Sequence, residues 1–392
     1  MKTLVVRAVV VVGAYVTTAL AVLLVVVVLR HAVSPVALRD VLGFYFISAL
    51  ASGLEPATVK ASVLRNGSPP DNLGGVLGAS AIKALAVSPI LGVIWRFADP
   101  GAPFAVVLLL PLVVVAGFWA TDVRVLLDLR GRHAWAVWLK QGSLAGGFVL
   151  LAVLTGVGLS LFWAVLVSSL ARLIPLVAIA IANGRGGGRG LVALKLLRDR
   201  RWVELAAVSA IAAAGGSIDR ILALRYLPAA SYGGYFLLYE LFSRFWLIPY
   251  LITPVLFASL AAGRSSRALM ARAWRLTLAA GAAFVVVVAV VAVASPAITL
   301  PLLGLPFGAP VIAFAAAVGV AALTQLRIAE LQGLGAARRT LVVTALGALV
   351  SAVVFFIGVR SMGIDGLLWA WLVKSLVELV AAMSGGPRER NA

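Results

Sequence analysis

The sequence predicts an all-α membrane protein with about twelve transmembrane helices, and three observations support this prediction. Of the 392 residues, 63% are hydrophobic and 12% are charged, and the mean hydropathy is +1.10. Soluble domains contain roughly 45–50% apolar and roughly 25% charged residues. Apolar runs long enough to cross a bilayer, about 20 residues each, follow one another from Ala8 to Met383. The third observation is that the basic residues fall on alternate loops.

Glycine, proline and charge clusters divide the apolar sequence into segments of spanning length. The first segment is longer than the roughly 7–15-residue core of a signal peptide and is followed by Arg30-His31-Ala32, which does not resemble a cleavage site, so we interpret it as a helix that stays in the protein. The predicted helices are 8–29, 38–62, 73–95, 103–127, 138–157, 160–182, 203–226, 231–259, 273–295, 308–332, 339–358 and 364–383.

Basic residues gather after the second, fourth, sixth, eighth and tenth predicted helices and at the C-terminus. The stretch Ser295–Pro310, after the ninth helix, contains none. Loops rich in Lys and Arg stay in the cytoplasm, so both termini are predicted to be cytoplasmic. This topology and an attraction to anionic lipid headgroups account for the net charge of +19, and no nucleic-acid partner is expected.

A glycine-rich basic segment divides the chain into two halves. It contains the run Gly184–Gly190 and predicts a flexible linker between two six-helix lobes. Pro56 and Pro254 lie deep inside the second helix of each half, which indicates a repeat. Because each half has an even number of helices, the repeat would be of the parallel type, with two lobes around a central cavity. The predicted parts are an N-terminal lobe at 1–183, a cytoplasmic linker at 184–202, a C-terminal lobe at 203–384 and a cytoplasmic tail at 385–392.

The sequence lacks the residue combinations of several enzyme classes. It contains no cysteine and only two histidines, so neither thiol chemistry nor a His cluster for a metal is expected. The glycine-rich linker lacks the G-x-x-x-x-G-K-[ST] pattern of a phosphate-binding loop. The predicted outer loops are too short for a catalytic constellation, so we expect neither an enzyme nor a cofactor.

Charged residues inside the predicted helices are the candidates for function, because each costs roughly 2.5–3.5 kcal/mol to insert. Glu55 and Lys83 both fall near mid-membrane and could pair. Glu240 and Arg244 are four residues apart and therefore share one face of a helix. An alternative role for such pairs is mutual neutralisation that fixes helix packing.

Two stretches of the second half resemble a known family. Residues 215–239 combine Asp219-Arg220, a short apolar segment, a small loop, and Gly-x-Tyr at 233–235 followed by an aromatic residue. Residues 254–260 are similar to a helix ending in Leu-Phe-Pro-x-Leu, with Ala258 at the position of the proline in that pattern. The chain thus resembles the polysaccharide and O-antigen repeat-unit flippases of the MOP superfamily, as do the opening residues 29–65.

The resemblance implies a two-lobed transporter that alternates between inward- and outward-facing states in the cytoplasmic membrane. Its substrate would be a polyprenyl-pyrophosphate-linked oligosaccharide, and its other partners would be membrane lipids and polysaccharide-assembly proteins. A pyrophosphate needs fixed cations inside the membrane. The candidates are Lys83, Arg244, Arg172 and Lys60 as cavity cations, Glu55 and Glu240 as charge-balancing or ion-coupling acids, Asp219 and Arg220 as the motif, and Tyr235, Tyr239 and Trp246 as rings for glycan stacking.

Other interpretations stay open at this point. A multidrug exporter of the same superfamily would carry cations and would need cavity acids without matching bases. A polymerase or ligase acting on polyprenyl-linked glycans would be expected to place reactive groups on a sizeable outer loop. Asp219 and Arg220 could instead anchor the protein at the membrane interface, where Trp and Tyr also gather.

Overall fold

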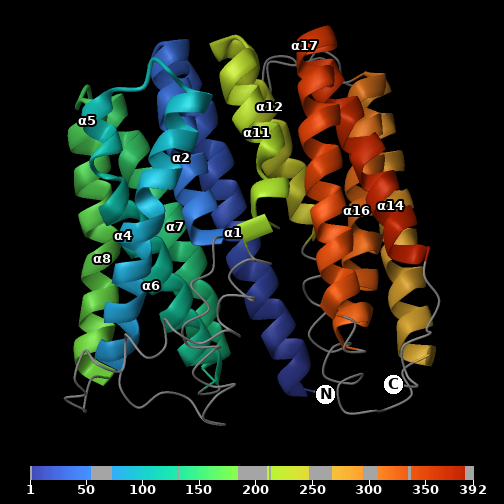
Figure 1. The fold of residues 1–392 in the computed structure, drawn as a ribbon, viewed down its shortest axis with the longest axis horizontal. Helices are drawn as coiled ribbons and strands as arrows, with labels where there is room; N and C mark the ends of the chain where they lie inside the picture. Colours follow the sequence, from blue (N-terminus) through green and yellow to red (C-terminus); the bar gives the residue numbers. More distant parts are fainter. Residues whose placement is uncertain are drawn as a thin grey trace. The chain divides into compact units, whose positions relative to one another are not determined.

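The computed structural model describes residues 2–53, 73–129, 132–183, 210–211, 213–246, 267–294, 308–333 and 337–384. Every regular element in these ranges is a helix, and the chain divides into two compact units, Met1–Ala213 (unit 1) and Ala214–Ala392 (unit 2). Figure 1 shows the helices of each unit as a bundle. The predicted linker at 184–202 and tail at 385–392 lie outside the described residues.

Unit 1 is built around α6, which packs against α2, α4, α7 and α8, while α1 packs against α7. The interior is apolar, with Trp95, Phe118 and Phe148 among its largest buried side chains. The described helices of unit 1 are α1 (Lys2–Ala32), α2 (Pro35–Gly53), α4 (Leu73–Ala98), α5 (Phe104–Val107), α6 (Leu110–Leu129), α7 (His133–Gly156) and α8 (Leu161–Asn183).

In unit 2, α16 packs between α14 and α17, and α11 packs against α17. Its core is aromatic: Phe314 stacks on Phe242 with ring centroids 5.3 Å apart and lies 5.6 Å from Trp371. The described elements of unit 2 are α11 (Ile218–Tyr226), α12 (Ala229–Ser243), the 3-10 helix η1 (Arg244–Trp246), α14 (Arg267–Ala294), α16 (Ala309–Gly333) and α17 (Ala337–Met383).

Two of the predicted boundaries differ from the structure for identifiable reasons. The single helix predicted at 103–127 is interrupted between α5 and α6, where Pro111 occupies the first turn of α6 and has no N–H to continue the hydrogen bonding of α5. The helix predicted at 203–226 contains a turn at Gly216 and Ser217, and the part at 203–209 lies outside the described residues.

The last two predicted helices form the two halves of α17, which meet at Gly363. Its backbone angles, φ 59° and ψ −128°, are ones that glycine adopts readily. Gly358 and Gly366 bring the two halves into backbone contact, since a β-carbon at Gly366 would lie 1.9 Å from the Gly358 carbonyl oxygen. Small residues thus allow the halves to run side by side.

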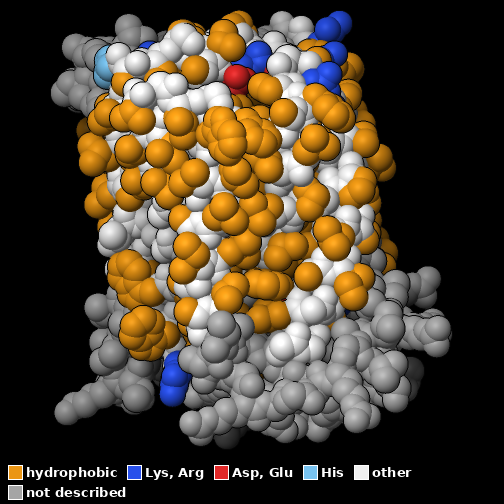
Figure 2. Space-filling view, turned by 90° about the vertical axis from the view of Figure 1, so that its left-hand side faces the viewer, with side chains coloured by type: hydrophobic (Ala, Val, Ile, Leu, Met, Phe, Trp, Pro, Cys, Tyr) orange, Lys and Arg blue, Asp and Glu red, His pale blue; other side chains and the backbone are white. Residues whose placement is uncertain are grey.

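The chain is a multi-pass membrane protein. Six of the described helices are long and apolar enough to cross a membrane, judged by length and composition. Figure 2 shows hydrophobic side chains covering the middle of one face, with basic and acidic side chains at its upper edge. The total of twelve spans and the cytoplasmic position of both termini stay predictions.

Candidate functional site

Arg172 lies near the middle of α8 and is only 6% exposed. Its side chain crosses the surface of α7 at Gly147, where a β-carbon would stand 2.4 Å from the Cδ atom of Arg172. A glycine at 147 therefore makes the space that the arginine occupies. The Nε atom of Arg172 is buried and has no hydrogen-bond partner among the described residues.

The side chains around Arg172 are hydroxyls and aromatic rings. The space between them is about 10 Å³ in this conformation, enough for about one water molecule. The residues that line it with Arg172 are Phe44, Tyr45, Ser48, Leu144, Gly147, Phe148, Leu151, Ser168 and Ser169. This lining contains hydrogen-bond donors for an anion but no carboxylate, so the arginine charge is not offset there.

Lys83 is also buried in unit 1, at 5% exposure, but an acid lies close to it. Asp122 of α6, itself 1% exposed, attracts the Lys83 ammonium and accepts a hydrogen bond from Ser80. The sequence-based partner, Glu55, lies outside the described residues, as does Lys60. Asp122 was missed, although a lone acid within the apolar run 103–127 was a signal for it.

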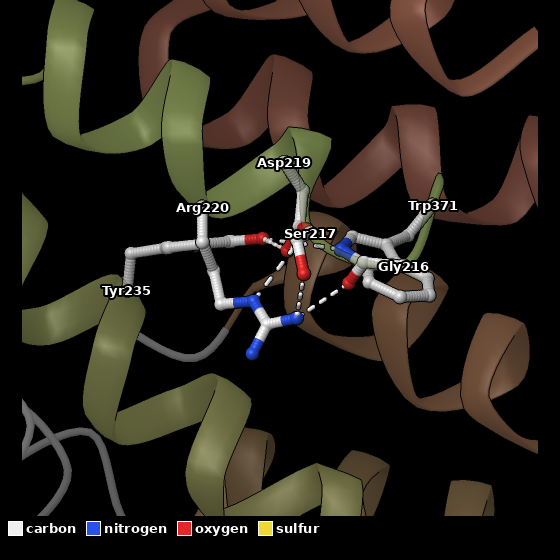
Figure 3. Close-up of polar contacts among 6 residues, drawn as sticks. All are labelled: Gly216, Ser217, Asp219, Arg220, Tyr235 and Trp371. Atoms are coloured by element: carbon white, nitrogen blue, oxygen red, sulfur yellow. Dashed lines mark hydrogen bonds and ion pairs between the residues drawn. The ribbon is translucent and has the colours of Figure 1, made fainter. Parts of the chain in front are cut away.

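The family-like motif of unit 2 forms a buried polar cluster (Figure 3). Asp219 is fully buried at the start of α11, and its Oδ2 atom accepts a hydrogen bond of 2.5 Å from the Tyr235 hydroxyl of α12. That hydroxyl accepts a hydrogen bond of 3.1 Å from the indole Nε1 of Trp371 in α17. The three side chains therefore join three helices of the unit.

Arg220 also belongs to this polar cluster. Its Nη2 atom donates to the Gly216 carbonyl at 2.5 Å and to the Ser217 hydroxyl at 3.2 Å, and its Nε lies 3.7 Å from Asp219 Oδ1 (Figure 3). The guanidinium also lies 4.4 Å from the centroid of the Tyr239 ring, at cation–π distance. Asp219 is thus fully buried in unit 2, and the Arg220 side chain is 15% exposed.

Two other basic residues of unit 2, Arg244 and Lys374, pair with acids that lie four residues away in the sequence. Arg244 forms an ion pair with Glu240, as the four-residue spacing predicts. Lys374 donates to Glu378 at 3.1 Å with the same spacing. The Glu378 side chain packs against the first half of α17 at Gly347, where a β-carbon would collide with it.

Three basic residues among the described ones are buried: Lys83, Arg172 and Lys374. Lys83 has Asp122 beside it and Lys374 has Glu378. Arg172 is the one for which the described part of the chain supplies no acid; its electrostatic neighbour is Tyr45. Charge compensation therefore favours Arg172 as a candidate, whereas the sequence alone favoured Lys83 and Arg244; the roles of all three stay predictions.

The proposed stacking rings are inside unit 2. Tyr235 is fully buried and Tyr239 is 6% exposed, with its ring 6.0 Å from Trp371. In this conformation neither ring offers a face to a sugar, so glycan stacking stays a prediction that requires a rearrangement. The side chain of Trp246 lies outside the described residues.

Comparisons with known proteins place the fold. No family model and no curated protein matches the sequence. Among solved structures, the lipid II flippase MurJ in an inward closed conformation aligns with TM-score 0.70 and 13% identity, over 97% of this chain and 87% of MurJ. The fold is that of MOP-superfamily transporters.

Two further structures share the MOP fold. A MATE transporter from Vibrio cholerae aligns with TM-score 0.61 and 14% identity, covering 97% of this chain and 94% of its own. A MOP-superfamily transporter from Pyrococcus furiosus, described as having a binding pocket of reverse polarity, aligns with TM-score 0.61 and 14% identity, over 98% and 94%. At these identities the likeness concerns the fold.

Proposed function

We propose that the protein is a flippase that moves a polyprenyl-pyrophosphate-linked oligosaccharide across the cytoplasmic membrane by alternating access. The observation that carries the proposal is the buried charge of Arg172, which no acid among the described residues offsets. An arginine held without a counter-charge at membrane depth is costly. A bound anion would offset that cost, so the site favours a negatively charged substrate.

The chemistry around Arg172 suits a phosphate group, and the site, which now holds about one water molecule, would open to admit it during the transport cycle. The guanidinium supplies a planar set of donors that matches phosphate oxygens, and the hydroxyl of Ser169 supplies a neutral donor. The hydroxyls of Ser48 and Ser168 donate to the Phe44 and Val165 carbonyls and would have to turn away from them to reach a phosphate. Lys83 would be a second cation for the pyrophosphate if Asp122 exchanged its partner. Arg244 and Lys60 stay candidates for a role in other states of the cycle.

A multidrug exporter of the MOP superfamily is the main alternative, because transporters described as multidrug MATE proteins share the fold. A cationic drug would be repelled by an uncompensated arginine inside the carrier. The likeness to MurJ, which is described as a lipid II flippase, supports a lipid-linked substrate. A glycan polymerase or ligase is the weaker alternative, since the fold is shared with transporters.

The test is translocation of a fluorescent polyprenyl-pyrophosphate oligosaccharide in liposomes with Arg172→Ala. We expect at least a tenfold loss of rate for this variant and partial recovery for Arg172→Lys, which keeps the charge but not the planar set of donors. The exposed Arg225→Ala is the matched control and should translocate normally. Efflux of organic cations without translocation of several such lipids would establish the exporter instead.

A further inference from the structure

The closed site at Arg172 is smaller than the group that the proposed function assigns to it. Its free volume is about 10 Å³, which is room for one water-sized particle. A phosphate group, with its oxygen atoms arranged around phosphorus, is much larger. What offsets the Arg172 charge in this conformation is therefore a separate question from what the site binds when it opens.

The guanidinium of Arg172 is held away from bulk water. Arg172 is 6% exposed, and its stem lies against α7 at Gly147. Tyr45 of α2 and Phe148 of α7 lie beside it with their ring centroids 4.4 Å apart, and leucines of α7 complete the apolar part of the lining. Solvent therefore screens this charge poorly, because side chains of low polarity surround it.

The site offers hydrogen-bond donors to a small guest. The Nε–H group of Arg172 is buried and donates to none of the described residues. Ser169, on the same helix and 1% exposed, adds a hydroxyl. The hydroxyls of Ser48 and Ser168 already donate to backbone carbonyls of their own helices. Since none of the described lining residues is a carboxylate, the site suits a guest that accepts hydrogen bonds.

Charge decides between a water molecule and an ion as that guest. A water molecule would accept the hydrogen bonds but leave the guanidinium without a counter-charge, which is unfavourable for any charge in a protein interior. A halide ion accepts the same hydrogen bonds and carries the opposite charge. Because it is a single atom only slightly larger than a water molecule, it also matches the size of the closed site.

We propose that Arg172 binds a chloride ion in the closed conformation of unit 1, with the Ser169 hydroxyl as a second donor. The ion neutralises the arginine while no substrate occupies the site. When the site opens, the phosphate of a lipid-linked substrate replaces the chloride. This replacement rests on the proposed function, whereas the chloride site itself does not.

Chloride binding can be measured on the full chain in nanodiscs of uncharged lipid, from the linewidth of the chloride nuclear magnetic resonance, which broadens when the ion exchanges with a protein site. We expect a broadening that saturates as the chloride concentration rises. Arg172→Gln should abolish the saturable part, because it removes the charge. Arg225→Gln removes the same charge at an exposed position of unit 2 and should bind as the unsubstituted chain. This control is needed because a net charge of +19 attracts chloride by itself.

A second pair of variants tests the position of the guanidinium and serves if Arg172→Gln fails to fold. Gly147→Ala displaces the arginine stem and should weaken chloride binding by about tenfold or more, the loss expected for one hydrogen bond to a charged group. Gly146→Ala, where a β-carbon meets nothing within 4 Å, should leave the binding unchanged. The proposal is overturned if chloride shows no saturable binding, as a site that holds only water predicts, or if the two members of either pair bind chloride alike.

Addition of a polyprenyl-pyrophosphate oligosaccharide separates the chloride site from the proposed function. If both proposals hold, the lipid reduces the chloride broadening as it binds. Saturable, Arg172-dependent chloride binding that persists at saturating lipid would count against a phosphate at Arg172 and would still support the chloride site.

Discussion

The side chain of Arg172 occupies the volume that a β-carbon of residue 147 would fill, with the two positions 2.4 Å apart. This relationship between α8 and α7 means that the candidate anion site depends on a glycine that bears no functional group. It also provides a way to displace the arginine without replacing it.

Gly147→Ala is expected to move the Arg172 stem and to lower translocation about tenfold, with an overpacking cost of about 1–3 kcal/mol. Gly146→Ala is the matched control, because a β-carbon there meets nothing within 4 Å. Both substitutions make the same change in helix propensity, so their difference in rate and in unfolding midpoint reports the contact with Arg172. Equal behaviour of the two variants would contradict this packing.

The Glu240–Arg244 pair is predicted to be structural. Arg244→Gln leaves Glu240 without its ion-pair partner and is expected to cost roughly 1.5–3 kcal/mol of unfolding free energy. The double variant Glu240→Gln/Arg244→Gln should lose less, because no lone charge remains. Chemical unfolding and translocation measured side by side decide the point: if Arg244 instead contacts substrate, the double variant will translocate as poorly as the single one.

Tyr235→Phe is expected to destabilise unit 2 by about 1–3 kcal/mol, because Asp219 loses a buried donor and Trp371 loses its acceptor. Tyr226→Phe is the comparison: that ring contacts Phe356 and Arg360, and its loss of a hydroxyl should cost less than about 0.5 kcal/mol. Thermal unfolding of the purified protein measures both. A Tyr235→Phe variant as stable as Tyr226→Phe would show that the hydrogen bonds contribute little.

The topology can be checked with single cysteines, since the sequence has none of its own. Val157, in the turn between α7 and α8, is 76% exposed and is predicted to face outward. Val157→Cys should react with an impermeant maleimide in intact cells, whereas Ser384→Cys should react only after the membrane is permeabilised. The reverse pattern would invert the assignment.

Much of the fold could be predicted because each helix is specified by its own apolar run. The break at Pro111 was not predicted, although a proline well inside the predicted helix 103–127 is a signal for a break or kink. The Glu240–Arg244 pair was predicted from spacing alone, and it forms because Arg244, which directly follows α12, keeps helical backbone angles. A contact can be predicted from sequence where a short stretch of helix fixes the distance between its two residues.

The candidate site was predicted less well, for a physical reason. Whether Lys83 is compensated depends on how α4 and α6 are rotated against each other, and that rotation brings Asp122, 39 positions away, to its side. The isolation of Arg172 likewise depends on which faces of α2, α7 and α8 meet. Sequence periodicity gives the faces of a helix but not the partner of each face.

The placement of the ion pairs has a consequence for biogenesis. The partners in Glu240–Arg244, Arg327–Glu330 and Lys374–Glu378 are only three or four residues apart. The segments α12–η1, α16 and α17 can therefore leave the translocon with these charges already paired. In unit 1, by contrast, Lys83 is neutralised only when α4 meets α6. Assembly of that unit in the bilayer should therefore depend more on when each helix is released. We expect α4 to stay at the insertion machinery until α6 has been synthesised.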